Sequence, residues 1–344
     1  MSLEVRIIER HIVIPIFIPH KGCPFDCIYC NQKNISGQKE DMTKDKMRLV
    51  VESHINTALP NSFIEIGFYG GSFTGIDKDE QLQFLETAYE YIKRGKIKGV
   101  RLSTRPDYIS QEILDYLKIY KVSTIELGVQ SLNEEVLVKS CRGHSIEDVV
   151  RACELIRKNG FTLGIQTMLG LPGDSFERAL NTGEKVVELM PDIVRIYPTL
   201  VIKDTYLEKM YKQGKYTPLR LDEAVDLCAK LLELYRNNNI NVIRIGLQPT
   251  ESINEGGDII AGPFHPAFRQ LVESKLALNS IEEMIKQKNL SGKDTIVICT
   301  SSEKISDVIG QKKSNISYLK EKYKFDIIKV KTCEDEHELY DIKY

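Results

Sequence analysis

Three cysteines stand close together near the start of the chain, at Cys23, Cys27 and Cys30, with the spacing CxxxCxxC. Thiolates are ligands that zinc and iron–sulfur clusters prefer. A structural zinc site usually needs four protein ligands, and His20 is too local in sequence to be an obvious fourth. A [4Fe–4S] cluster held by three thiolates instead leaves one iron with an open coordination position, where chemistry can take place.

The other cysteines are scattered singly along the chain. In a reducing compartment we expect them to be small buried apolar residues. They are Cys141, Cys153, Cys228, Cys299 and Cys333. Cys141 is set apart from the other four because it abuts Arg142, a suspected ligand-binding residue.

The overall composition is that of a soluble globular protein. With 344 residues and a formal net charge of −2, we expect no strong general attraction to nucleic acid or to an anionic membrane. The N-terminal stretch MSLEVRIIERH lacks the apolar segment of a signal peptide, and the run IVIPIFIP is too short to span a bilayer. We therefore expect a cytoplasmic protein with no membrane partner.

Short apolar, β-branched runs alternate with amphipathic helical stretches over residues 1–255. Repeated βα units with nearly continuous apolar strands predict a parallel sheet covered by helices. We expect an α/β fold in which an incomplete TIM barrel of about six βα units has a possible seventh strand at 241–249. The six expected strands are residues 11–18, 63–70, 98–104, 124–130, 162–170 and 192–200.

Polar and glycine-rich stretches follow directly after these expected strands. In barrels of this kind, the loops after the C-terminal ends of the strands build the functional site. The stretches are the cysteine loop, GGSFTG, STRPDY, GVQS and GLPGD. Because all of them fall where a barrel site would be built, we expect them to form one site.

The cysteine spacing, with Tyr29 just before the last cysteine, resembles the radical S-adenosylmethionine (radical SAM) superfamily. The resemblance implies that Cys23, Cys27 and Cys30 hold a [4Fe–4S] cluster and that the amino and carboxylate groups of SAM chelate its open iron. It also implies that an electron, from a reductant such as flavodoxin or ferredoxin, cleaves SAM to methionine and a 5′-deoxyadenosyl radical.

The same resemblance implies SAM contacts at the strand ends. In the family such residues contact the methionyl amino group, the ribose, the adenine and the carboxylate, and the last of these suits a bidentate guanidinium. The matching residues are Gly70, Gly71, Ser103, Thr104, Gln130, Arg142 and Met168. From the residues alone, Arg142 could instead be a solvated surface arginine, and Met168 a plain core residue.

Longer stretches narrow the resemblance to the catalytic subunit of Elongator and its relatives, which modify the wobble uridine of tRNA. The stretches STRPDY, ELGVQS, RGHSIEDV and YPTLVIKDTYLEKMYKQGKY carry it, within residues 11–250. The first cysteine spacing is shorter than in that subunit, and the chain is too short to hold its acetyltransferase domain. An acyl-CoA or acetyltransferase partner, or a different co-substrate, is therefore expected.

Two other branches of the superfamily fit less well. The oxygen-independent coproporphyrinogen oxidases share the cysteine spacing, but their pattern usually continues with a cysteine where this chain has Gln32. The methylthiotransferases carry a second cluster on an N-terminal domain, and here only about ten residues precede the first expected strand.

Residues 256–290 are predicted to be a connector and a helix, and residues 291–344 a separate small α+β domain. Its expected strand–helix–turn–helix–strand order resembles a KH domain, whose GxxG loop clamps single-stranded nucleic acid. Here the RNA-binding loop would be Gly310, Gln311, Lys312 and Lys313, so lysine replaces the second glycine. A degenerate KH-like domain used for protein contact or dimerisation is the alternative.

Three functional hypotheses follow from these observations. The first is a radical SAM enzyme acting on RNA, with tRNA as the substrate. The second is a radical SAM enzyme acting on a small molecule or peptide, in which the KH-like domain is structural. The third is a non-catalytic iron–sulfur RNA-binding protein, which the full set of SAM-site residues disfavours. The catalytic residue that quenches the product radical is unknown, and Tyr197, Cys141 and His265 are candidates.

Overall fold

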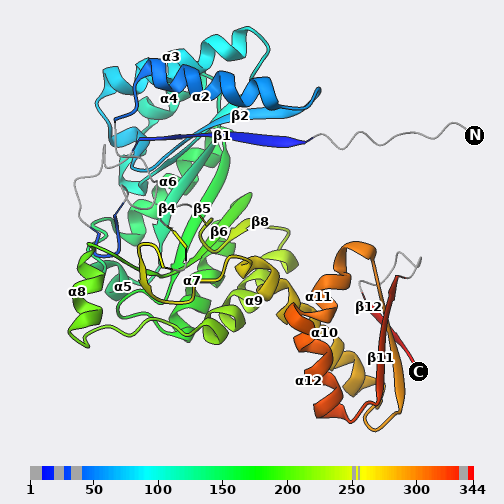
Figure 1. Ribbon diagram of the computed structural model, residues 1–344. Coiled ribbons are helices and arrows are strands. Elements are labelled where there is room, and N and C mark those ends of the chain that lie inside the picture. The colour runs from blue at the N-terminus through cyan, green and yellow to red at the C-terminus, as the bar shows by residue number, and fades with distance from the viewer. Residues whose placement is uncertain (1–9, 19–26, 32–40, 250–252, 255, 333–339) are drawn as a thin grey trace, which may run out of the picture.

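The computed structural model describes residues 10–18, 27–31, 41–249, 253–254, 256–332 and 340–344. Two cysteines considered above, Cys23 and Cys333, lie outside these ranges. A large unit built on a curved sheet is followed by a small unit, and the long helix α10 (Phe268–Gln287) joins the two (Figure 1).

A parallel sheet of seven strands, in the order β1-β2-β3-β4-β5-β6-β8, forms the centre of the large unit. Every neighbouring pair in it is parallel, which confirms the incomplete TIM barrel and its seventh strand. The strands are β1 (His11–Phe17), β2 (Phe63–Tyr69), β3 (Gly99–Thr104), β4 (Val122–Gln130), β5 (Thr162–Leu169), β6 (Ile193–Pro198) and β8 (Asn241–Ile245).

The predicted sixth strand, residues 192–200, is shorter in the structure. It ends at Pro198, and the next two-residue strand, β7 (Val201–Ile202), leaves the sheet to pair antiparallel with β9 (Ile259–Ala261). Proline has no N–H for the ladder and favours the end of a strand, which explains the break.

Helices connect the strands and begin at polar capping residues. Ser145, for example, forms a capping box with Asp148 at the start of α6. The helices of the large unit are α2 (Lys44–Thr57), α3 (Lys78–Lys93), α4 (Gln111–Ile119), α5 (Glu134–Lys139), α6 (Ile146–Lys158), α7 (Phe176–Glu188), α8 (Tyr206–Lys212) and α9 (Leu221–Asn237). Short 3-10 helices lie at Phe73–Gly75 and Pro106–Tyr108. Within the described residues, no helix has the length and apolar character needed to cross a membrane.

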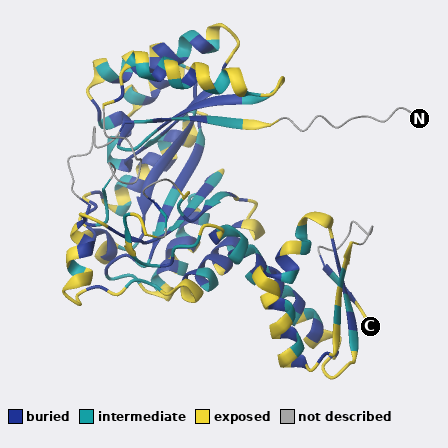
Figure 2. Ribbon diagram, in the orientation of Figure 1, coloured by how far each residue is buried: buried dark blue, intermediate teal, exposed yellow. Residues whose placement is uncertain are grey.

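The two faces of the sheet differ in chemistry because successive side chains of a strand point to opposite faces. The helix-covered face carries an apolar core, to which Ile66, Leu102 and Ile125 belong. Figure 2 shows that the strands are buried and that the outer surfaces of the helices are exposed. The other, concave face carries charged residues in the middle of the strands. A barrel interior is usually packed with branched apolar side chains, so this polar face indicates a binding function.

The small unit contains β10 (Thr295–Thr300), α11 (Ile305–Ile309), α12 (Ser314–Tyr323), β11 (Ile327–Thr332) and β12 (Tyr340–Lys343), with 3-10 turns at Ser302–Lys304 and Gln311–Lys313. Its sheet has the order β11-β10-β12, with β10 parallel to β11 and antiparallel to β12. The predicted strand–helix–turn–helix–strand order is present, while the assignment as a KH-like domain stays a prediction.

Helix α10, which falls in the predicted connector, belongs to both cores. Phe268 and Val272 pack in the core of the large unit, whereas Ala277 and Ile281 pack in the core of the small one. Buried Asn315 of α12 strengthens this attachment by donating to the Ser274 carbonyl of α10 at 2.9 Å. The packing therefore changes from one unit to the other within α10.

The scattered cysteines differ in their surroundings. Cys153 and Cys228 are free and buried, as predicted, and burial raises the pKa of the Cys153 thiol to about 12. Cys141 is exposed and has a φ of +51°, so the expectation of a buried residue is wrong there. Cys299 is buried, as predicted, but it is disulfide-bonded, which was not expected for a small apolar core residue in a reducing compartment.

Candidate functional site

The residues expected to form the site lie at the C-terminal ends of the parallel strands, where a barrel builds its site. They end or follow the successive strands β1 to β5 and include Cys27, Cys30, Gly70, Gly71, Ser103, Gln130 and Met168. Arg142 joins them from the loop between α5 and α6. The topology therefore brings together stretches that are more than a hundred residues apart.

Cys27 and Cys30 stand on one tight turn, in which the Cys30 N–H donates to the Cys27 carbonyl at 2.9 Å. Cys27 is buried and Cys30 is half-buried. Ile28 anchors the turn, because its N–H donates to the Ser140 carbonyl at 3.3 Å and its own carbonyl accepts from the Leu207 N–H at 2.7 Å. The two thiols are thereby fixed against the segment after α5 and the start of α8.

Arg142 links this cysteine turn to β4. Its Nη1 donates to the Cys27 sulfur at 3.5 Å, and its Nη2 donates to the Gly128 carbonyl at 2.6 Å. Arg142 is only 8% exposed, which excludes the alternative of a solvated surface arginine. The cysteine turn is therefore held to β4 through one buried guanidinium.

Gly128 provides the space that this guanidinium occupies. A Cβ atom on Gly128 would lie 2.7 Å from Arg142 Nη2 and 3.1 Å from Gln130 Nε2. A side chain there would therefore push Arg142 away from Cys27. The sequence placed this glycine in a motif, but its function as space for a distant arginine required the tertiary structure.

Arg105 holds the backbone of the Arg142 loop. Its Nη1 donates to the Arg142 carbonyl at 2.7 Å, and its Nε and Nη2 form a bidentate pair with the Asp107 carboxylate at 2.9 and 2.8 Å. The side chain is 2% exposed, so Arg105 is a positioning residue. This positioning function is not predicted by the sequence, although the two-residue spacing of arginine and carboxylate in RPD indicates a local pair.

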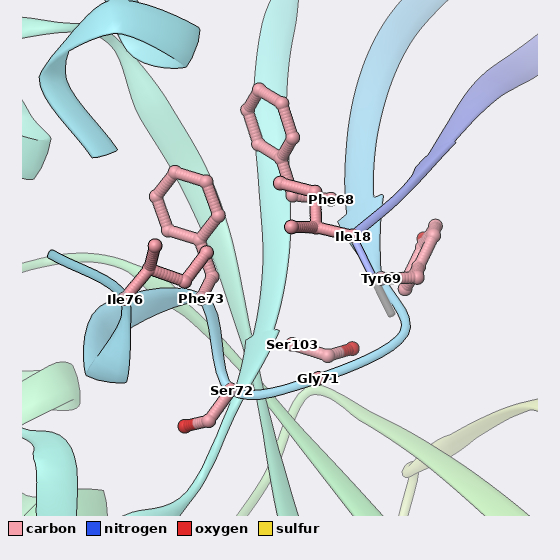
Figure 3. Close-up of a pocket in the computed structure, with 8 residues that line it drawn as sticks. All are labelled: Ile18, Phe68, Tyr69, Gly71, Ser72, Phe73, Ile76 and Ser103. Carbon is pink, nitrogen blue, oxygen red and sulfur yellow. The ribbon is translucent and has the colours of Figure 1, made fainter. Parts of the chain in front are cut away.

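Gly70 brings the ends of β1 and β2 together. Its φ is +99°, and a Cβ atom there would lie 3.2 Å from the backbone nitrogen of Ile18, which itself donates to the Tyr69 carbonyl at 2.7 Å. Only glycine adopts this backbone at so close an approach without strain. The next residue, Gly71, lines a narrow pocket together with Tyr69 and Ser103 (Figure 3).

Ser103 and Thr104 face opposite sides of the sheet. The Thr104 hydroxyl bonds to Ser72 Oγ at 2.8 Å and to Thr74 Oγ1 at 2.5 Å, so it supports the turn after β2. Ser103 accepts from Gln166 Nε2 at 3.0 Å on the concave face. Figure 3 shows the hydroxyls of Ser72 and Ser103 directed away from each other. Of the predicted pair, Ser103 is therefore the one whose side chain a ligand on the concave face can reach.

Gln130 and Met168 lie at the ends of the next two strands. Gln130 has a φ of +68°, and the register between β4 and β5 shifts between Gly128 and Gln130. Such a strained backbone at a non-glycine residue is typical of functional sites. Met168 is half-buried and in register with Tyr197, whereas its neighbour Leu169 belongs to the buried core. The core-residue alternative therefore fits Leu169 better than Met168.

A network of charged residues, which was not predicted from the sequence, lies deeper on the concave face. Glu126, which is 1% exposed, accepts from Arg195 Nε at 2.5 Å and from Arg195 Nη2 at 3.0 Å. Arg101 Nε lies 3.8 Å from Glu126 Oε1 and 3.7 Å from Glu65 Oε2. The signal was a single charged residue in the middle of each apolar strand, in FIEIGF, GVRLST, TIELGV and DIVRIY.

Burial and neighbouring charges shift the pKa values of several groups at the site. Burial opposes the charge of Arg195, but the Glu126 carboxylate outweighs it and raises the pKa of Arg195. Burial, reinforced by Glu126, raises the pKa of Tyr69, which therefore stays a neutral phenol. Burial, with Arg142 and Arg105 nearby, lowers the pKa of His144 to about 3. His144 is thus neutral near pH 7, and its Nε2–H donates to the Val129 carbonyl at 3.2 Å.

The predicted nucleic-acid turn connects α11 to α12. Gly310 has a φ of +74°, and Lys312 and Lys313 have φ values of +52° and +64°, which side-chain-bearing residues rarely adopt. Both lysines are exposed, and neither ammonium group is paired with another residue in the part of the chain that the structure describes. Gln311 Nε2 lies 3.3 Å from His265 Nε2, so the turn contacts the segment before α10.

The donor set of the cysteine turn fits an iron–sulfur cluster. Two thiols stand within one turn, and a guanidinium donates to one of them. The third expected ligand, Cys23, is outside the described residues. Within those residues, no three His, Cys, Asp or Glu side chains gather closely enough to hold a metal ion. The described part of the site therefore supplies two of the three thiolates that such a cluster needs.

Comparisons with known proteins agree with this geometry. The model of the radical SAM superfamily matches residues 17–186, and that of the radical SAM C-terminal domain matches residues 191–277. The tRNA uridine(34) acetyltransferase of Methanocaldococcus infernus is 30% identical over 263 residues, which cover 65% of this chain and 49% of that protein. Elongator complex protein 3 of Saccharomyces cerevisiae is 30% identical over 198 residues, which cover 55% of this chain and 35% of that protein.

The solved structure of archaeal Elp3 from Methanocaldococcus infernus, with an N-terminal deletion, has a TM-score of 0.62 to this chain. The match covers 82% of this chain and 64% of the archaeal chain. At 22% sequence identity, the likeness shows a shared fold. The chain spans about half the length of the acetyltransferase that it matches.

The pair of Glu126 and Arg195 generates a stability prediction. Glu126→Gln leaves the buried charge of Arg195 without a carboxylate partner, so we expect a loss of about 3–5 kcal/mol in the free energy of unfolding. The double variant Glu126→Leu/Arg195→Met removes both members of the pair and should recover most of that loss. Urea unfolding measures both values, with Glu135→Gln, in an exposed ion pair, as a control that stays close to wild type. A small loss in Glu126→Gln would contradict the buried pairing.

The neutral, buried His144 generates a pH prediction. Its pKa is lower in the folded chain than in the unfolded chain, where it is about 6.5. Below that pH the unfolded state binds a proton that the folded state does not, so stability falls as the pH drops toward 3. Between pH 7 and pH 5, wild type should lose about 2 kcal/mol more than His144→Asn in urea unfolding. If wild type and His144→Asn lose the same free energy of unfolding between pH 7 and pH 5, the His144 imidazole is exposed to solvent and the prediction is wrong.

Proposed function

The chain belongs to the radical SAM superfamily, whose cofactors are a [4Fe–4S] cluster and S-adenosylmethionine, and from this premise we propose that it is an enzyme that modifies tRNA. Two relatives that it resembles over more than half of its length are named as a tRNA uridine(34) acetyltransferase and as Elongator complex protein 3. The chain spans only 49% and 35% of those two proteins, so their substrate does not transfer to it directly. We therefore state tRNA as the proposed substrate.

The observation that carries the radical SAM chemistry of the proposal is the position of Arg142, whereas tRNA as the substrate rests on the relatives. One guanidinium contacts both the thiol of Cys27 and the end of β4, where Gln130 has a strained backbone. Cys23, Cys27 and Cys30 would hold the cluster. Bound together, the cluster and SAM supply a 5′-deoxyadenosyl radical by one-electron cleavage of SAM.

The chain's own residues would bind and orient SAM beside the cluster. The turn after β2 offers backbone groups to the amino group, because its glycines allow a close approach. Arg142 would neutralise the carboxylate while Arg105 and Asp107 hold its loop in place. The proposed SAM contacts are Gly70, Gly71, Ser103, Gln130, Arg142 and Met168, with Thr104 contributing support through Ser72 and Thr74.

The small unit would bind the RNA strand through the turn from Gly310 to Lys313. Two exposed lysines with left-handed backbone present positive charge at its tip, and neither is neutralised by a described acidic group. Phosphate attraction of this kind is independent of sequence and weakens with salt. A small electron donor such as flavodoxin or ferredoxin and an acyl-CoA or acetyltransferase partner complete the proposed system.

A radical SAM enzyme for a small polar molecule is the second candidate function. The charged network of the concave face favours it, since Glu126, Arg195 and Arg101 lie where a small substrate would sit within the barrel. In this case the small unit would be structural.

Formation of 5′-deoxyadenosine, with and without total tRNA, tests the proposal. With the cluster reconstituted anaerobically, and with SAM and a strong reductant present, we expect wild type to release more of this product when tRNA is added. Cys27→Ala and Cys30→Ala should reduce the product to background, because each removes a cluster ligand. Cys153→Ala, in a buried position on α6, is the matched control and should behave as wild type.

The possible outcomes separate the candidate functions. If wild type releases the same amount of 5′-deoxyadenosine with and without tRNA, the tRNA proposal is rejected and the small-molecule candidate is favoured. No product from wild type with a full cluster would contradict the radical chemistry itself. Circular dichroism of each variant distinguishes loss of the cluster from loss of the fold.

A further inference from the structure

A second cavity lies at the last strand of the sheet, away from the cysteine turn. Its volume is about 530 Å³, within the range of small-ligand sites. It is formed between the end of β8, the start of α10 and α11. Among the residues that line it are Arg244, Gln248, Phe268, Arg269, Glu273 and Asp307. Because β8 is parallel to the other strands, its C-terminal end, which lines this cavity, lies at the same edge of the sheet as the SAM-site residues.

Arg244 is the notable side chain of this cavity. It is half-buried, yet within the described residues its guanidinium forms no hydrogen bond or ion pair. Its neighbour Arg269 differs, because Nη1 donates to the Val242 carbonyl at 2.9 Å and Nε lies 3.6 Å from Glu273 Oε1. Arg269 is therefore held by the protein, whereas Arg244 has donors available to a ligand.

The two acidic groups of the cavity are already neutralised by other cations. Glu273 pairs with Arg236 at 2.7 Å and with Lys304 at 3.3 Å, and Lys304 also pairs with Asp307 at 3.0 Å. Although burial alone would raise the pKa of Glu273, these cations lower it, so the carboxylate is ionised and engaged. The charge left over in the cavity is that of Arg244, which selects for an anion.

The cavity lies between the RNA-binding turn and the concave face. On one side, Gln270 Nε2 donates to the Ser306 carbonyl at 3.4 Å, and Gln311 of the turn contacts His265. On the other side, Arg244 is in register with Arg195, and its charge acts on Tyr197 at the end of β6. The elements around the cavity therefore contact the turn on one side and the concave face on the other.

We propose that this cavity binds one phosphorylated nucleotide of the RNA substrate, with its phosphate on Arg244 and its nucleoside against the apolar wall formed by Leu247, Pro266 and Phe268. The inference rests on the proposed function, because it takes RNA to be the substrate. The proposed nucleotide-binding site is separate from the SAM site. It lies between β8 of the large unit and α11 of the small unit.

Binding of fluorescently labelled total tRNA, measured by anisotropy at several salt concentrations, tests the inference. Arg244→Gln should weaken binding about fivefold or more and should reduce the slope of log Kd against log salt by about 0.7–0.9, the value for one phosphate contact. Arg244→Lys keeps the charge and should keep the slope. Arg151→Gln, which removes an exposed arginine that pairs with Asp148 on α6, should match wild type.

Gln248→Glu is a second variant, since it places a negative charge at an exposed position of the same cavity without removing any observed contact. It should also weaken binding. Coenzyme A, whose nucleotide carries phosphates, serves as a competitor. If it binds to wild type but not to Arg244→Gln and leaves tRNA binding unchanged, the cavity holds a free nucleotide and the RNA assignment is overturned.

Wild-type affinity and slope in both Arg244→Gln and Gln248→Glu would overturn the inference. The proposed function would then still stand wherever tRNA stimulates the release of 5′-deoxyadenosine. Failure of wild type to bind tRNA at all would instead overturn the proposed function, and the inference with it. The two failures are therefore distinguishable.

Discussion

The contact of one buried guanidinium with a cysteine sulfur is the interaction on which the rest of the site depends. Arg142 reaches Cys27 and the Gly128 carbonyl at once, and so connects the cysteine turn after β1 to the end of β4. This geometry requires a glycine at position 128 and a fixed loop, which Arg105 provides through the Arg142 carbonyl. A buried charge in such a place is costly unless it is bonded, and it is retained where it has a function.

The two faces of the sheet divide stability and function between them. The helix-covered face holds the apolar core and keeps the strand ends in register. The concave face contains buried ion pairs, such as that of Glu126 with Arg195, where apolar side chains would otherwise pack. Replacing such pairs by apolar residues is often neutral or stabilising, so their presence in a barrel interior points to ligand binding. The small unit adds a basic turn that contacts the segment before α10 through Gln311.

Much of this architecture could be predicted from the sequence, because local patterns carry it. Apolar β-branched runs located the strands, and parallel topology put the polar stretches after them at one edge. What could not be predicted depends on contacts between distant residues. Arg105 acts on a carbonyl 37 residues away, Thr104 faces the helices while Ser103 does not, and Cys141 is exposed. The cavity at Arg244 is formed by three separate elements, so no local pattern predicts it.

The most direct test of this account is the affinity of the reconstituted protein for SAM when Arg142 is replaced by lysine. Lysine keeps the charge but not the planar fork that reaches Cys27 and Gly128 together. The account predicts an iron content close to that of wild type and a Kd for SAM that rises about tenfold or more, equivalent to about 1.4 kcal/mol. An unchanged Kd in Arg142→Lys would contradict it, because the guanidinium would then have no part in holding SAM beside the cysteine turn.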